Sequence, residues 1–373
     1  MATAREDRPE PDRAGDAPHP RFAEHLFGQD AAQAGFLDAF NAGRLHHGWL
    51  ITGPEGVGKA TLAWIIARFL LTTPDAEPAG LFGPSPPATL ATDPNHPVAH
   101  RLRALSEPGL FLLRRPFDDK TDKLKTQITV DEVRKLNNFF HLSATDGGRR
   151  VVIVDAMDEM NVQAANALLK MLEEPPHRTT LLLIAHQPAR LLPTIRSRCR
   201  ELRLSPLGPT AMAAALDQAG AGTPDDPAAL AELAGGSVGE ALRLIAEDGL
   251  TLYARLAALA DSLPRLDRPL MLALADLTAG RNDARADLMF QLLDRLIARL
   301  ARTGATGLPP QVELVPGEAR MLARLSPDPA RARDWATAAQ VISARISHGR
   351  AVNIDAPNLM LDALLRLQEI AQA

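Results

Sequence analysis

A glycine-rich segment constrains the fold of this chain more than any other feature. Residues 53–59, Gly-Pro-Glu-Gly-Val-Gly-Lys, follow the apolar run Gly48–Thr52 and precede a helical pattern from about Gly58 to Leu71. A Gly-x4-Gly-Lys segment between a strand and a helix is the pattern of a phosphate-binding loop. Its backbone N–H groups and the N-terminus of the helix point towards an anion, and the lysine ammonium reaches the phosphate oxygens. The sequence therefore predicts a P-loop fold.

Four more apolar runs predict the remaining strands of a sheet. They lie near residues 110–113, 151–155, 181–185 and 201–204, and helical patterns separate most of them. Strands without alternating polar residues are buried on both faces, as in a parallel sheet covered by helices. The expected fold class is α/β: a parallel P-loop sheet covered by helices, followed by an all-α lid and an all-α C-terminal domain.

The chain has 373 residues, which is too long for one compact core. We expect residues 1–20, rich in Pro, Asp, Arg and Ala, to form a disordered tail. Residues 21–206 are predicted to form the P-loop domain, 207–249 a helical lid, and 250–373 a helical oligomerisation domain. The last segment carries an apolar stripe that suits packing into an oligomeric collar, namely Leu288, Phe290, Leu292, Leu293, Leu296 and Leu300.

Composition narrows the class of protein. The formal net charge is −4, so the chain has no overall basic field that could hold nucleic acid by itself. Its single cysteine, Cys199, excludes a disulfide framework and a four-cysteine zinc site, and fits a reducing compartment. The charged N-terminus does not fit a signal peptide, and no apolar run reaches the roughly 18 residues of a membrane helix. We therefore expect a cytoplasmic protein without membrane contact.

The hydrolytic parts of the nucleotide site are missing. A P-loop needs Ser or Thr after its lysine because that hydroxyl ligates Mg²⁺, but this chain has Ala60. Thr61 lies about 100° further round the helix and is expected to point away from the site. Asp155 ends its strand at the usual position of the Mg²⁺ anchor, yet Ala156 follows where active ATPases of this kind carry a glutamate.

We therefore expect the chain's own ATPase activity to be absent or very weak, with no metal and no required cofactor. Weak ATP or ADP binding stays open, as does the alternative that Asp155 is a solvated carboxylate at a strand end. The degenerate nucleotide site consists of Gly53, Pro54, Glu55, Gly56, Val57, Gly58, Lys59, Ala60, Thr61 and Asp155.

Four segments together resemble the subunits of bacterial DNA polymerase III clamp loaders, which are AAA+ P-loop proteins. They are the P-loop, the strand ending at Asp155, the run Ala164-Ala-Asn-Ala-Leu-Leu-Lys-Met-Leu-Glu-Glu-Pro-Pro176, and Ile195-Arg-Ser-Arg-Cys199. The resemblance covers about residues 22–245, and the remaining part is similar only in being helical.

Two kinds of clamp-loader subunit share these motifs, the gamma/tau motor and delta-prime. The resemblance implies that a motor has an intact P-loop, Asp-Glu after the strand, a four-cysteine zinc insertion and a lid arginine in Gly-Ser-x-Arg. This chain has Ala60, Ala156 and one cysteine, and Gly239 stands where the lid arginine is expected. Three catalytic losses together resemble the delta-prime kind.

The resemblance also implies a role for Arg198. This residue is in the position of an arginine finger, which acts in trans on ATP bound by the neighbouring subunit. The alternative is a surface arginine that closes the preceding helix. The implied partners are the gamma/tau motor and delta subunits in a pentameric ring and, through the complex, the sliding clamp and primer–template DNA. The rival hypothesis is an active motor ATPase in which Thr61 or Asp158 rescues the metal.

Three other features have structural interpretations that we prefer. His46 and His47 are expected to lie at the mouth of the 48–52 strand, because no metal-ligand partners have suitable spacing. The basic stretch from Arg114 to Lys125 is expected to be a solvated loop, with an auxiliary DNA contact as the alternative. Cys199 is expected to pack, and Ser197 to support its turn.

Overall fold

The computed structural model describes residues 9–13, 15, 17–74, 85–142, 148–222, 224–280 and 283–372. The chain divides into two compact units. The first comprises Met1–Thr223 with Gly236–Leu242, and the second comprises Pro224–Gly235 with Arg243–Ala373.

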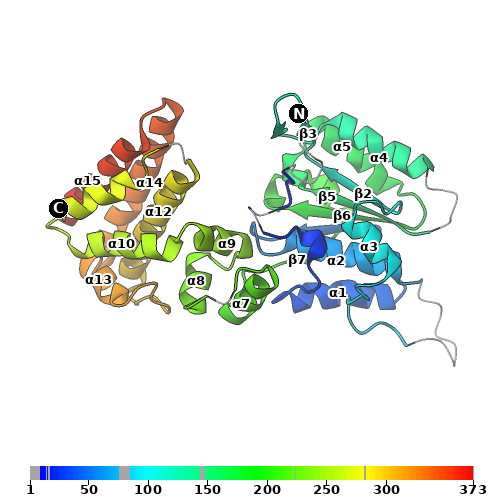
Figure 1. Ribbon diagram of the computed structural model, residues 1–373, viewed down its shortest axis with the longest axis horizontal. Helices are drawn as coiled ribbons and strands as arrows, with labels where there is room; N and C mark the ends of the chain where they lie inside the picture. The colour runs from blue at the N-terminus through cyan, green and yellow to red at the C-terminus, as the bar shows by residue number, and fades with distance from the viewer. Residues whose placement is uncertain are drawn as a thin grey trace. The chain divides into compact units, whose positions relative to one another are not determined.

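The first unit is built on a five-stranded parallel sheet, shown in Figure 1. The strand order is β2-β5-β6-β1-β7. The strands are β1 (Gly48–Thr52), β2 (Leu110–Arg114), β5 (Arg150–Asp155), β6 (Thr179–Ala185) and β7 (Arg200–Arg203). All five coincide with predicted strands, which confirms the α/β fold class. A short antiparallel hairpin, β3 (Phe117–Asp118) and β4 (Lys123–Leu124), interrupts the stretch that we predicted to be a plain loop.

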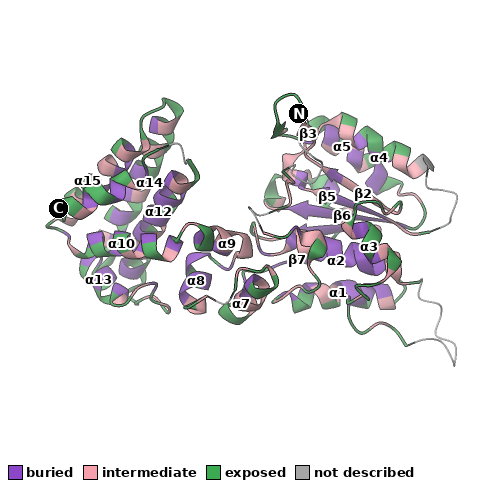
Figure 2. Cartoon of the chain, in the orientation of Figure 1, coloured by how far each residue is buried: buried purple, intermediate pink, exposed green. Residues whose placement is uncertain are grey.

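Helices cover both faces of the sheet. Leu50 of β1 belongs to the core under α4 (Val130–Leu142) and α5 (Val162–Glu173). Trp49 of the same strand packs on Phe36 of α1 (Asp30–Asn41), with ring centroids 4.9 Å apart. Because successive side chains alternate between two buried faces, the strands read as continuous apolar runs. Figure 2 shows β6 buried throughout.

The other helices of the first unit are shorter, apart from the one that follows the P-loop. They are α2 (Lys59–Thr72), α3 (Pro97–Arg103), α6 (Pro193–Arg196), α7 (Pro209–Gln218) and the start of α9 (Val238–Ala246), with 3₁₀ turns at Pro20–Phe22, Met157–Glu159 and Pro188–Arg190.

The second unit is entirely helical. Its helices are α8 (Pro227–Leu233), α10 (Gly249–Asp261), α11 (Arg268–Asp276), α12 (Asp283–Thr306), α13 (Glu318–Leu325), α14 (Pro329–Ala351) and α15 (Ala356–Gln372), together with the end of α9. The buried Glu318 carboxylate fixes the loop before α13. It accepts hydrogen bonds from Arg299 Nε at 2.8 Å, the Tyr253 hydroxyl at 2.5 Å and Leu314 N at 2.7 Å.

The apolar stripe of α12 does not form a free contact surface. Every residue of the stripe is at most 8% exposed within the single chain, from Leu288 to Leu300. The stripe therefore fills the core of the second unit, and our interpretation of it as an oligomer contact was wrong. Among the residues that the structure describes, no helix combines the length and the apolar character needed to cross a lipid bilayer.

Candidate functional site

The P-loop lies where the sequence predicts it, between β1 and α2, and its lysine is bonded within the loop itself. Lys59 Nζ donates hydrogen bonds to the carbonyl oxygens of Gly53, at 2.7 Å, and Pro54. The side chain is buried, and this desolvation lowers the pKa of Lys59 to about 8. Gln29, just before α1, supports the loop by donating to the carbonyl oxygen of Val57 at 3.3 Å.

The start of α9 packs directly on this loop. The Gly56 carbonyl accepts hydrogen bonds from the N–H groups of Val238, at 2.9 Å, and Gly239, at 3.3 Å. Gly56 has a φ of +74°, and a Cβ added to it would lie 2.1 Å from Ser237 Oγ. Glycine is therefore required at position 56 by conformation and by space. Gly239, where a motor would carry its lid arginine, presents only backbone to the loop.

The carboxyl of Asp155 lies among other ionisable side chains. Burial raises the pKa of Asp155 to about 7, and the carboxylates of Asp12 and Glu159 add to the rise. The positive charges of Arg114 and Lys59 oppose this rise without cancelling it. Desolvation is the largest cause of the shift, and the residue is half-buried.

The acids that could rescue a metal are engaged elsewhere. Asp158 accepts hydrogen bonds from the backbone N–H groups of His186, at 2.5 Å, and Gln187, at 3.0 Å, and so holds the end of β6. Glu159 forms an ion pair with Arg115 at 2.8 Å. Within the described ranges, no three His, Cys, Asp or Glu side chains are grouped so that they could hold a metal ion. Position 60 is alanine, so it provides no hydroxyl for the magnesium of a bound nucleotide.

Arg198 lies between α6 and β7. One guanidinium nitrogen, Nη1, donates to the Thr194 carbonyl at 3.0 Å, and the other, Nη2, lies 3.0 Å from Glu173 Oε1 at the end of α5. The Arg198 side chain is 38% exposed, so another molecule can still reach it. Ser197 Oγ donates to the same Thr194 carbonyl at 3.2 Å, which confirms that Ser197 supports this turn.

Arg198 and the P-loop lie at opposite ends of the parallel strands. Arg198 is at the N-terminal ends and the P-loop at the C-terminal ends. Strands β1 and β7 are parallel, and Trp49 pairs with Arg200 near their first residues. Arg198 precedes β7, whereas the P-loop follows the last residue of β1. These two ends are about 17 Å apart, because five residue steps separate Gly48 from Gly53 and each step is about 3.3 Å long. An arginine side chain is too short to cross this distance, so Arg198 cannot serve the P-loop of its own chain.

Two neighbouring features lie as predicted. Cys199 is half-buried and packs against the core, and burial raises the pKa of its thiol to about 12, which disfavours the reactive thiolate. His46 and His47 stack just before β1, with ring centroids 4.3 Å apart. His47 Nε2 lies 2.9 Å from the Leu172 carbonyl oxygen at the end of α5.

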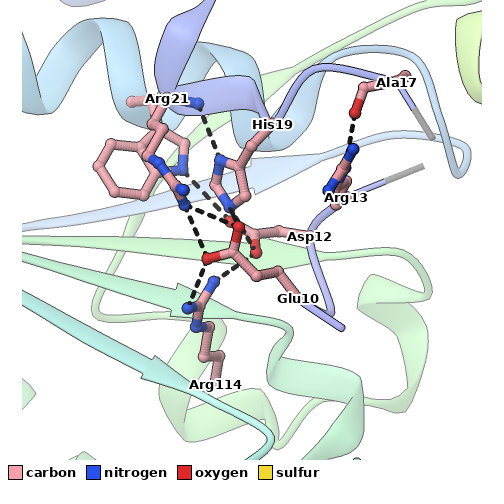
Figure 3. Close-up of polar contacts among 8 residues, drawn as sticks. Glu10, Asp12, Arg13, Ala17, His19, Arg21 and Arg114 are labelled. Carbon is pink, nitrogen blue, oxygen red and sulfur yellow. Dashed lines mark hydrogen bonds and ion pairs between the residues drawn. The ribbon is translucent and has the colours of Figure 1, made fainter. Parts of the chain in front are cut away.

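One charged network, shown in Figure 3, was not predicted from the sequence. Within the segment predicted to be a disordered tail, Glu10, Asp12 and His19 pack against the P-loop unit. Arg114, at the end of β2, donates to Asp12 Oδ1 at 2.7 Å and to Glu10 Oε1 at 2.9 Å. His19 Nε2 lies 3.0 Å from Asp12 Oδ1, and both side chains are nearly inaccessible to solvent. Arg21 donates to both oxygens of Glu10, at 2.7 and 2.8 Å.

We call the described residues of 9–22 the N-terminal strap. The Asp12 pKa falls to about 2 despite its burial, because the imidazole of His19 and the charge of Arg114 favour the carboxylate. The expectation of disorder therefore does not hold for these residues, since the carboxylates of Glu10 and Asp12 are paired with Arg21, Arg114 and His19. The rest of residues 1–20 lies outside the described ranges or makes fewer contacts.

Comparison with known proteins finds similarity to subunits of DNA polymerase III. Residues 28–208 match the family model described as DNA polymerase III, delta subunit. The chain is 41% identical over 204 residues to the DNA polymerase III subunit delta' of Pseudomonas aeruginosa, over 53% of this chain and 55% of that protein. It is 32% identical over 200 residues to subunit gamma/tau of Mycobacterium tuberculosis, over 52% of this chain and 30% of that protein.

The chain thus spans about half or less of the length of these curated relatives. A solved DNA polymerase III gamma subunit-related protein from Thermotoga maritima is similar with 17% identity and a TM-score of 0.39, over 90% of this chain and 99% of that one.

The parallel sheet and the P-loop define the first unit as an α/β domain of the P-loop class. Residues 28–208 match the DNA polymerase III delta subunit family, and the chain resembles the delta-prime subunits of that family.

Proposed function

We propose that this chain is a clamp-loader subunit that does not hydrolyse ATP and lends Arg198 to ATP bound by a neighbouring motor subunit. The observation that carries the proposal is the separation of Arg198 from the chain's own P-loop by the length of β1. A phosphate that Arg198 contacts would therefore not be one held in this chain's own P-loop, which suits a nucleotide bound by a neighbouring subunit. The guanidinium would stabilise the charge that develops on the transferred phosphoryl group, a contribution of about 10³–10⁵ in rate.

The state of the chain's own nucleotide site supports the same proposal. Lys59 is bonded to its own loop, Ala60 provides no hydroxyl, and Asp155 has a raised pKa. A site with these properties would not support magnesium-dependent hydrolysis. The expected partners are motor subunits of the gamma/tau kind and a delta subunit in a pentameric ring, which opens a sliding clamp and places it on primer–template DNA.

The second candidate function is that of an active motor, which the similarity to a gamma/tau subunit favours. The two functions differ in what the isolated chain does with ATP. We expect the purified full-length chain to release no phosphate above background from ATP with Mg²⁺ and primed DNA. Clear turnover that Lys59→Ala abolishes would favour the motor.

A further inference from the structure

We propose that Glu173 is a positioning residue for Arg198: it holds the guanidinium at the edge of the sheet in the orientation that a neighbour's phosphate requires. This inference rests on the proposed role of Arg198 as a finger in trans. It assigns a function to the last residue of α5, which lies 25 positions away from Arg198 in the sequence.

Two protein elements hold the guanidinium. Arg198 Nη2 lies 3.0 Å from Glu173 Oε1, and Nη1 donates to the Thr194 carbonyl at 3.0 Å. A guanidinium has five N–H donors in a planar fork, and these two contacts use two of them. Three donors remain for phosphate oxygens, so Arg198 can contact a phosphate without leaving Glu173. The two contacts restrict a side chain that would otherwise sample many rotamers.

The ion pair of Glu173 and Arg198 is too exposed to contribute much to the folding stability of the chain. The Glu173 side chain is 44% exposed and the Arg198 side chain 38% exposed. Ion pairs that are open to solvent contribute little to folding stability, because solvent screens them and ordering two long side chains is unfavourable. The geometry of this pair is thus more useful to a partner at the surface than to the fold.

The backbone that carries the pair is fixed by the start of β1. A Cβ added to Gly48 would lie 3.1 Å from Leu172 Cδ2 and 3.3 Å from the Arg198 carbonyl oxygen. One strand therefore packs closely on both the end of α5 and the turn of Arg198. His47 Nε2, 2.9 Å from the Leu172 carbonyl oxygen, adds a second contact to the end of α5. The separation between Glu173 and Arg198 is consequently set by the sheet and does not depend on a flexible loop.

The test uses the full-length chain assembled with motor and delta subunits, with Mg²⁺-ATP, sliding clamp and primed DNA. The difference in ATP turnover between the wild-type complex and the Arg198→Ala complex measures the ATP hydrolysis that depends on Arg198. We expect Glu173→Ala to lower the kcat of this Arg198-dependent hydrolysis about 10-fold. The KM for ATP and the assembly of the complex should not change, because a misplaced guanidinium weakens the transition state more than it weakens ATP binding. Glu173→Gln, whose amide oxygen can still accept a hydrogen bond, should recover part of the loss.

Glu174→Ala is the matched control, because the next residue is also an exposed glutamate, and it should behave as wild type. The double variant Glu173→Ala/Arg198→Ala should be no slower than Arg198→Ala alone. If Arg198→Ala lowers turnover but Glu173→Ala does not, or if Glu173→Ala raises it, the positioning role is wrong while the finger stands. If Arg198→Ala changes nothing, the proposed function and this inference both fail.

Discussion

Arg114 Nη1 donates a 2.7 Å hydrogen bond to Asp12 Oδ1 and so joins the N-terminal strap to the end of strand β2. Arg114 is also the register partner of Asp155 on β5. Asp12 of the strap therefore lies near the candidate nucleotide site, and its carboxylate contributes to the raised pKa of Asp155. Two regions that are about a hundred residues apart in the sequence form one electrostatic unit.

Removing one partner of this buried pair should destabilise the first unit. We expect Asp12→Asn to lower the free energy of unfolding by about 2–4 kcal/mol, because it leaves the charge of Arg114 partly uncompensated. Urea unfolding followed by circular dichroism measures this. Asp131→Asn is the control, since its pair with Arg134 is largely exposed, and it should cost less than about 1 kcal/mol. Equal effects of the two variants would contradict a structural role for the strap.

The raised pKa of Asp155 predicts a pH-dependent stability difference. Because the pKa is raised from 3.8 to about 7, the folded state binds more protons than the unfolded state between these values, and stability falls as pH rises through this window. Asp155→Asn removes the effect. The variant should match wild type near pH 4 and exceed it by roughly 2–4 kcal/mol at pH 8, at about 1.4 kcal/mol per pH unit.

Urea unfolding of both proteins at pH 4, 6 and 8 checks this prediction. Asp158→Asn provides a contrast, because Asp158 accepts two backbone hydrogen bonds and its replacement should destabilise the protein at pH 8. If Asp155→Asn is the less stable protein at pH 8, the carboxylate is stabilising and our description of the site is incorrect.

Restoring the missing hydroxyl should not restore hydrolysis. Ala60→Ser supplies the group that ligates Mg²⁺ in active P-loops, but Ala156 still provides no base, and Asp158 and Glu159 remain engaged. We expect phosphate release by the isolated variant to stay at background with Mg²⁺-ATP and primed DNA. Turnover that appears with Ala60→Ser and disappears on adding Lys59→Ala would show that one substitution had disabled an otherwise intact enzyme.

Much of the fold could be predicted from the sequence because its elements depend on local patterns. Strand β5 is apolar since both of its faces are buried, and the P-loop has a fixed spacing between a strand and a helix. The N-terminal strap could not be predicted, because its order comes from ion pairs with Arg114, about a hundred residues away. The stripe on α12 shows a related limit: periodicity identifies an apolar face, but not whether the face is covered by the same chain or by another.

The candidate site also has features that could be predicted from the sequence and one that could not. The losses at Ala60 and Ala156 are visible from the motif, because each position has a fixed chemical role. The contact between Glu173 and Arg198 depends on how the end of α5 meets the turn before β7. Only the sheet register brings these two segments together.

The proposed action of Arg198 on a neighbour's ATP is best tested by the ATP turnover of the assembled complex with Arg198→Ala in this chain. Arg196→Ala, which changes another arginine of the same segment, is the control. With clamp and primed DNA, we expect both variants to assemble normally. Single-turnover hydrolysis at the site facing this chain should fall at least about 10³-fold in Arg198→Ala only. Unchanged hydrolysis in a fully assembled Arg198→Ala complex would contradict the account.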